Sequence, residues 1–98
     1  MFHCIVIDDE YLARQRIFSF VEQQDGWQVD AQSGEYAEAK NLLLKYKPDV
    51  CFMDINIIGG SGIELACLLS KSIDCRWVFT TAYSEYAIQA FDLEATDY

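Results

Sequence analysis

Short apolar runs alternate along the chain with segments of helical period, and no repeat or low-complexity tract interrupts them. The run 4–7 is apolar at every position, which is typical of a strand whose sheet is covered by helices on both faces. Alternating or clustered apolar residues predict three further strands, at 27–31, 50–53 and 77–79. Apolar residues three or four positions apart predict four helices, marked by Ala13, Ile17, Phe20 and Val21; Ala39, Leu42, Leu43 and Tyr46; Ile63, Ala66 and Cys67; and Ala87, Ala90 and Phe91.

Polar, proline and glycine residues predict where these helices begin and end. The first helix should end near Gly26, and the second should stop at Pro48 because proline cannot continue a helix. The third should begin after a flexible turn at 59–62, since Ser61 and Glu64 have the spacing of a capping box. The glycines of this turn lack the lysine and the spacing of a phosphate-binding P-loop.

Strands that alternate with helices predict a parallel sheet with right-handed crossovers, which is a doubly wound α/β fold. Ligands bind such sheets at the carboxyl ends of the strands, and here the first and the third predicted strands both end in acids. In the flavodoxin-like strand order 2-1-3-4-5 these two strands are neighbours, with ends about 5 Å apart. Asp8 and Asp9 after the first strand and Asp54 after the third are therefore expected to share one pocket.

Three carboxylates in one pocket repel one another, because two of them about 4 Å apart interact unfavourably by about 4 kcal/mol at an effective dielectric constant of about 20. A hard divalent cation relieves this repulsion, and Mg²⁺ takes carboxylate ligands while leaving positions for phosphoryl oxygens. The cluster therefore suits phosphoryl chemistry, in which an aspartate can be the nucleophile. Taken singly, Asp9 could cap the first helix and Asp54 could be a solvated loop acid, but two neighbouring strand ends favour the cation site.

The fourth predicted strand ends in Thr80 and Thr81, followed by the small Ala82. A hydroxyl at this edge could donate a hydrogen bond to a phosphoryl oxygen, and Ala82 would leave room for the phosphate. Threonine is also an ordinary strand residue, so this feature gains its meaning only from the acids nearby.

Composition narrows the class of protein. With 98 residues, 52% of them hydrophobic, the chain is expected to form one packed domain. Its net charge of −9 would repel a nucleic-acid backbone, so no direct contact with DNA or RNA is expected. No apolar run approaches the roughly 20 residues that span a bilayer, which predicts a soluble cytoplasmic protein. In that compartment Cys4, Cys51 and Cys67 are expected to be reduced thiols in the core.

Four segments of the sequence resemble the motifs of a known family. They are IVIDDE at 5–10, FMDIN at 52–56, SGIEL at 61–65 and FTTAY at 79–83. Together they resemble the receiver domain of bacterial response regulators in two-component signalling, and the resemblance covers the whole chain. The segment 81–98 is similar to the receivers that precede LytTR-type (LytR/AlgR) DNA-binding domains.

The resemblance implies that Asp54 is the phosphoacceptor, which takes a phosphoryl group from a sensor histidine kinase. It also implies a Mg²⁺ cofactor held by Asp9, Asp54 and the backbone carbonyl of Asn56, with Asp8 helping through a metal-bound water. Such a domain is not an enzyme in the usual sense, although it takes part in its own phosphorylation and dephosphorylation.

The resemblance further implies a switch at the end of the fourth strand. Thr81 would move its hydroxyl toward the phosphate beside Ala82, and the rotamer of Tyr98 would follow it. The two states would differ in a surface for dimerisation or for an output such as transcription. DNA would be contacted only through an output domain absent from this chain.

Two positions depart from the family pattern. Ile58 stands where the family usually has proline, a rigid turn residue, and is therefore expected to loosen the loop after the third strand. The family's lysine falls just past Tyr98, where a fifth strand should begin. The receiver domain at 1–98 is therefore expected to be C-terminally incomplete, without its fifth strand and fifth helix. Strand 77–79 would then be an open apolar edge, which predicts self-association.

Two other functions fit parts of this pattern. A phosphatase with an aspartate nucleophile typically carries that residue on the first strand and a second Asp two positions on, where this chain has Asn56 after Asp54. An interaction module with the receiver fold would instead signal without phosphate. Incubation with Mg²⁺ and a small acyl phosphate separates these functions, because only a phosphoacceptor retains one added phosphate.

Overall fold

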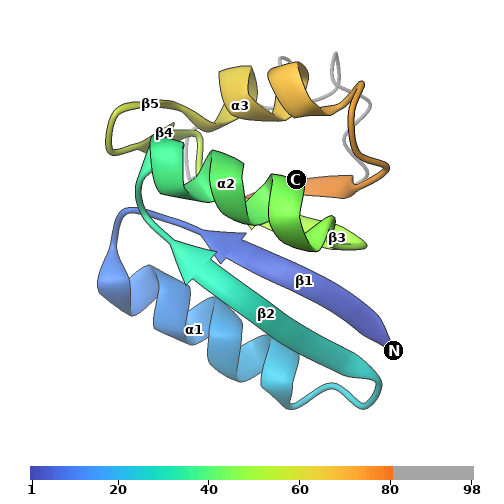
Figure 1. Cartoon of the computed structure of the whole chain (residues 1–98). Helices are drawn as coiled ribbons and strands as arrows, with labels where there is room; N and C mark the ends of the chain where they lie inside the picture. Colours follow the sequence, from blue (N-terminus) through green and yellow to red (C-terminus); the bar gives the residue numbers. More distant parts are fainter. Residues whose placement is uncertain (81–98) are drawn as a thin grey trace.

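The computed structural model describes residues 1–80, in which helices cover both faces of a parallel sheet (Figure 1). The sheet contains β1 (Phe2–Ile7), β2 (Trp27–Ser33), β3 (Val50–Met53) and β6 (Arg76–Phe79), in the order β2-β1-β3-β6. Each neighbouring pair of strands in it is parallel. Since β6 is the fourth predicted strand, the predicted order 2-1-3-4 is confirmed, while the helix predicted at 87–91 lies outside the described residues.

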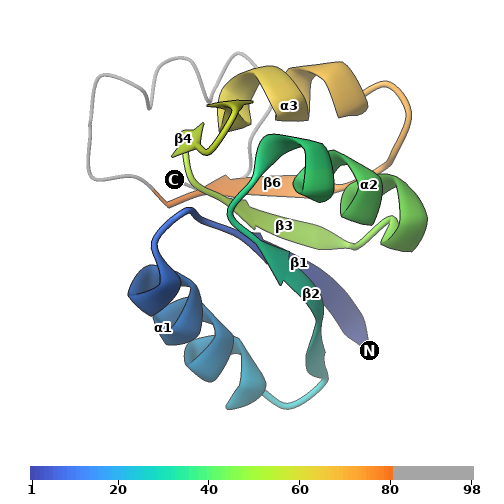
Figure 2. The ribbon, with the colours of Figure 1, turned by 60° about the vertical axis from the view of Figure 1, so that its left-hand side comes forward.

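The helices are divided between the two faces of the sheet. Helix α1 (Tyr11–Glu22) packs against one face, while α2 (Tyr36–Tyr46) and α3 (Gly62–Leu69) cover the other, and Figure 2 shows α1 below the sheet with α2 and α3 above it. Between β3 and α3 the chain forms a short antiparallel hairpin of β4 (Asn56–Ile57) and β5 (Gly60–Ser61), in place of a plain flexible turn. Within residues 1–80 no helix is long and apolar enough to cross a membrane.

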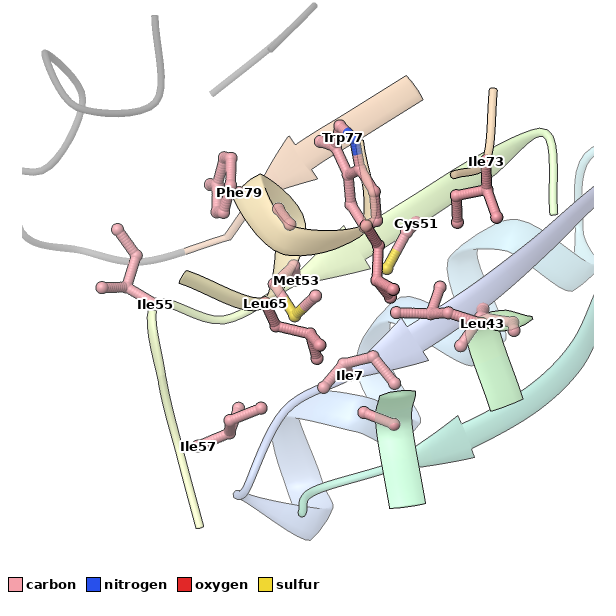
Figure 3. Close-up of a cluster of buried hydrophobic side chains, with 14 residues drawn as sticks. Ile7, Leu43, Cys51, Met53, Ile55, Ile57, Leu65, Ile73, Trp77 and Phe79 are labelled. Atoms are coloured by element: carbon pink, nitrogen blue, oxygen red, sulfur yellow. The ribbon is translucent and has the colours of Figure 1, made fainter. Parts of the chain in front are cut away.

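The hydrophobic core has two parts, one on each face of the sheet. The larger part lies between the sheet and helices α2 and α3 (Figure 3), and its buried members are Ile5, Ile7, Ala39, Leu43, Cys51, Met53, Ile55, Ile57, Leu65, Ala66, Leu69, Ile73, Trp77 and Phe79. The smaller part lies under α1 and is formed by Cys4, Val21 and Val50. Every residue of the run 4–7 is 0% exposed, which confirms that β1 is covered on both faces.

The ends of the helices follow local chemistry. Helix α2 ends where Lys47 adopts a left-handed φ of 46° and Pro48 follows. At the start of α3, the Ser61 hydroxyl oxygen accepts a hydrogen bond from the Glu64 N–H at 3.3 Å, which confirms one half of the predicted capping box. Helix α1 ends at Glu22, about one turn earlier than its pattern predicts, because the next two N–H groups bond to carbonyls three positions back.

Three side chains of the predicted apolar stripes, Phe20, Tyr46 and Cys67, lie on the surface. Phe20 is 64% exposed, because α1 meets the sheet through Ile17 and Val21 instead. Cys67 is exposed and not in the core as predicted, because α3 buries Leu65, Ala66 and Leu69 instead. Helix α3 is apolar on nearly every side, so its period alone does not select the buried face.

Candidate functional site

Strands β1 and β3 end side by side, and acidic residues follow both of them. Ile7 is paired with Met53 at the last position of the ladder, and the Asp54 N–H donates to the Ile7 carbonyl at 2.8 Å. Carboxylate oxygens of Asp8, Asp9 and Asp54 consequently lie within 4.8 Å of one another. The structure therefore brings the three acids together, as the neighbouring strand ends predict.

Backbone N–H groups hold two of these three carboxylates. Asp8, which is only 5% exposed, accepts from the Glu10 N–H at 2.9 Å, and Asp54 accepts from the Ile55 N–H at 2.8 Å. The N-cap of α1 is Glu10, without a side-chain hydrogen bond, so the alternative that Asp9 caps this helix is wrong. Among residues 1–80, no lysine or arginine forms an ion pair with the three acids.

Burial shifts the acid–base equilibria of the two inner carboxyl groups. Removal from water, helped by the negative charge of Asp8, raises the pKa of Asp54 from 3.8 to about 6 although the Ile55 N–H opposes the change. Removal from water likewise raises the pKa of Asp8, against the hydrogen bond from the Glu10 N–H. A bound cation would act in the opposite direction, because it stabilises the charged form of both groups.

We expect the Asp54 carboxyl to make the metal-free protein less stable as pH rises from about 4 to about 6. The pKa is 3.8 for an ordinary Asp and about 6 in the fold, so over this range the folded state keeps a proton that the unfolded chain has lost. The stabilisation by this proton is complete below about pH 4 and is lost as pH rises through about 6. Urea unfolding at several pH values, on the wild type and Asp54→Asn, measures the effect.

The asparagine variant carries no titrating group at this position. Between about pH 4 and about pH 6, the unfolding free energy of the wild type should therefore drop by about 1 kcal/mol relative to that of the variant, once solvent screening is allowed for. A difference in unfolding free energy that stays constant between about pH 4 and about pH 7 would contradict the raised pKa of Asp54.

The other predicted site residues lie partly outside the described chain. Asn56 is the exposed first residue of β4. Its backbone N–H stabilises the Asp54 carboxylate and so opposes the rise in the pKa of Asp54. Thr81, Ala82 and Tyr98 lie beyond residues 1–80, so their roles stay predictions.

Two glycines lie against the backbone of the acids, and the sequence pattern did not reveal this role. A Cβ atom at Gly62 would meet the Asp54 carbonyl oxygen and would lie 2.7 Å from Met53 Cγ. A Cβ atom at Gly34 would lie 2.9 Å from the Asp8 carbonyl oxygen. Only a residue without a side chain fits these two places. A glycine directly after a strand or at a helix start is the available sequence signal, but turns and caps produce it as well.

The loop after β3 is tied to the turn between β2 and α2. The Ile58 N–H donates to the Gly34 carbonyl at 3.0 Å, and the Ile58 carbonyl accepts from the Tyr36 N–H at 2.8 Å. Proline has no N–H and could not make the first of these bonds. Ile58 therefore makes a backbone bond that proline could not make, while the expected loosening of this loop stays a prediction.

Comparisons with known proteins agree on one family. A family model described as response regulator receiver domain matches residues 4–98. An uncharacterized response regulatory protein of Shewanella oneidensis is 35% identical to the chain, covering 100% of it and 42% of the relative. The sensory transduction protein LytT of Bacillus anthracis is 36% identical, covering 100% of this chain and 40% of the relative. The chain thus spans about two fifths of the length of these curated relatives.

Among solved structures, the response regulatory domain of protein mrkE from Klebsiella pneumoniae superposes with a TM-score of 0.91 at 32% identity. The match covers 98% of this chain and 80% of that one. At this TM-score and coverage the two chains share one fold, the doubly wound α/β sheet described above.

Proposed function

This chain belongs to the response regulator receiver domain family, and on that premise we propose that Asp54 accepts a phosphoryl group from a sensor histidine kinase. The flavodoxin-like fold, the place in two-component signalling and the likeness to LytT regulators, all expected from the sequence, are confirmed. One observation carries the assignment of Asp54. Its carboxylate lies within 4.8 Å of those of Asp8 and Asp9, at the carboxyl ends of neighbouring strands.

The surroundings of Asp54 suit a nucleophile. The Ile55 N–H donates to its Oδ1 at 2.8 Å and so orients the carboxylate, one oxygen of which attacks phosphorus. In the transfer, a bond forms between that oxygen and phosphorus while the bond from phosphorus to the donor histidine nitrogen breaks. Although burial raises the pKa of Asp54 to about 6, the group is mostly ionised near neutral pH and therefore remains nucleophilic.

The same acids fit a Mg²⁺ cofactor, because Mg²⁺ prefers oxygen ligands and is usually bound by one or two protein carboxylates together with several waters. Asp9, Asp54 and the backbone carbonyl of Asn56 would hold the ion, and Asp8 would reach it through a water. When bound, Mg²⁺ would neutralise charge on the phosphoryl group in transfer. Asp9 is exposed, so its carboxylate can turn toward an ion without a loss of core packing.

Mg²⁺ should raise the melting temperature of the protein, because it binds the folded pocket and relieves the repulsion between carboxylates. At about ten times the dissociation constant the gain is about 1.4 kcal/mol, or about 6 to 11 °C for a domain of this size. Asp9→Ala should remove most of this shift. Asp25→Ala removes the same charge from an exposed position outside the acid cluster, so this variant should keep the full Mg²⁺-dependent rise in melting temperature. Circular dichroism melts in EDTA and in MgCl₂ measure both, and equal shifts in Asp9→Ala and the wild type would place the metal elsewhere.

Phosphorylation is tested directly by incubation with Mg²⁺ and a small acyl phosphate, followed by intact mass measurement. The proposal expects one added phosphoryl group that depends on Mg²⁺. A protein that binds Mg²⁺ yet gains no phosphate from either acyl phosphate or a phosphorylated kinase would favour the phosphorylation-independent interaction module instead.

The consequence of phosphorylation would lie in a surface of this domain. We infer that Thr81 and Ala82 meet the phosphate, that Tyr98 follows the change, and that a surface for dimerisation or for an output such as transcription is altered. The net charge of −9 makes the domain itself a poor binder of nucleic acid, so DNA would be contacted through an output domain.

A further inference from the structure

We propose that the turn between β2 and α2, centred on Gly34, is a positioning element. It holds the loop of Asp8 and Asp9 at a set distance from the loop that follows Asp54, and the Ile58 N–H joins the second loop to the turn. The proposal rests on the proposed function, because it concerns the geometry of the Mg²⁺ and phosphoacceptor pocket. It assigns no step of the reaction to the turn itself.

On one side, the turn supports the loop of Asp8 and Asp9. The Asp8 N–H donates to the Ser33 carbonyl at 2.9 Å, which continues the β1–β2 ladder into the loop. Gly34 follows directly, so close that a Cβ atom there would lie 2.9 Å from the Asp8 carbonyl oxygen and from Asp9 Cα. The Arg14 guanidinium donates to the same Asp8 carbonyl at 2.8 Å and packs beside Gly34. This loop therefore has little freedom to move toward β2.

On the other side, the turn supports the loop that follows Asp54. The Gly34 carbonyl accepts from the Ile58 N–H at 3.0 Å, and the Tyr36 N–H donates back to the Ile58 carbonyl at 2.8 Å. These two bonds make a parallel bridge between Glu35 and Ile58. The Tyr36 ring lies against the hairpin, since a Cβ atom at Gly60 would lie 2.6 Å from Tyr36 Cδ2. The hairpin carries Asn56, whose carbonyl is a proposed ligand.

The backbone of Ile58, and not its side chain, makes this connection. The side chain is 60% exposed, so it adds little to the core. Its N–H is the group that bonds to Gly34, and proline, which the family usually has at this position, offers no such donor. A bond between two segments far apart in sequence restrains both, and here it joins the segments that carry the two halves of the pocket.

The test is Ile58→Pro, with Ile58→Ala as the matched control that keeps the N–H and loses the exposed side chain. Titration calorimetry with MgCl₂ should show about a fivefold loss of Mg²⁺ affinity in Ile58→Pro, the scale of one lost hydrogen bond. Ile58→Ala should stay within about twofold of the wild type, because no partner is removed. Unchanged or tighter Mg²⁺ binding by Ile58→Pro overturns the proposal.

A second variant and a wild-type measurement protect the test from a variant that merely unfolds. Gly34→Ala pushes on the Asp8 carbonyl and Asp9 Cα from the same turn and should also weaken Mg²⁺ binding. In the metal-free wild type, the Ile58 amide should be protected from hydrogen exchange, and Mg²⁺ should increase that protection although Ile58 is no ligand. An Ile58 amide that exchanges at the unprotected rate overturns the positioning role. Loss of Mg²⁺ binding and of Asp54 phosphorylation in the wild type would instead refute the proposed function.

Discussion

Asp54→Asn is expected to abolish phosphorylation by acyl phosphate and Mg²⁺ while leaving the metal-free protein folded. The amide has no anionic oxygen to attack phosphorus, so no phosphoryl group should be retained on this residue. The substitution also removes a partly buried charge that lies within 4.8 Å of two other carboxylates. The variant should therefore be somewhat more stable than the wild type near neutral pH. Intact mass after incubation and urea unfolding in EDTA measure the two effects.

The control for Asp54→Asn is Asp25→Asn, which makes the same change of charge and shape at an exposed acid outside the cluster. It should be phosphorylated to the same extent as the wild type. Stoichiometric labelling of Asp54→Asn, or loss of labelling in the control alone, would show that the acceptor is a different residue.

Gly62→Ala is expected to be the most destabilising small substitution near the site. Its Cβ atom would meet the Asp54 carbonyl oxygen and would lie 2.7 Å from Met53 Cγ. A backbone carbonyl cannot rotate away as a flexible side chain can, so the cost should be at the upper end of overpacking, about 3 kcal/mol. For a domain of this size, that corresponds to a melting temperature lowered by about 12 to 24 °C. Thermal unfolding in EDTA measures the loss without a contribution from the metal.

The control for Gly62→Ala is Gly26→Ala, because Gly26 has open space around it but a positive φ of 84°. Its cost comes from backbone conformation alone and should be about 1 kcal/mol. If the two variants lost the same stability, crowding against the Asp54 carbonyl would not be what requires glycine at position 62. Gly62→Ala should also weaken Mg²⁺ binding, since the displaced carbonyl belongs to the residue that bears the acceptor carboxylate.

The sheet and the place of the acid pocket were open to prediction from the sequence because both follow from short-range patterns. An apolar run such as 4–7 needs cover on both faces, which requires helices between parallel strands. Parallel strands in that arrangement end at one edge of the sheet, so Asp8 and Asp54 had to come close once strands one and three were neighbours. The carboxylates of the pocket belong to side chains, so their chemistry follows directly from the residue types in the sequence.

The buried faces of two helices were less open to prediction. Period indicates that a stripe is apolar, but the surroundings determine which residue of a broad stripe is covered. Helix α1 leaves Phe20 at the surface and uses Val21, and the nearly all-apolar α3 leaves Cys67 outside. Burial of this kind depends on where the sheet lies relative to the helix, which is a property of the assembled layers.

By itself, the sequence determined the fold class and, once the strand order of the flavodoxin-like fold was adopted, the three acids that converge. Only the tertiary structure decided how their loops are held, because the bond from the Ile58 N–H to the Gly34 carbonyl joins backbone groups that nearly every residue possesses. Which of these groups meet depends on how distant loops approach each other. The raised pKa of Asp54 has a similar origin, since it comes from burial in the folded chain and from the charge of Asp8, which is remote in sequence.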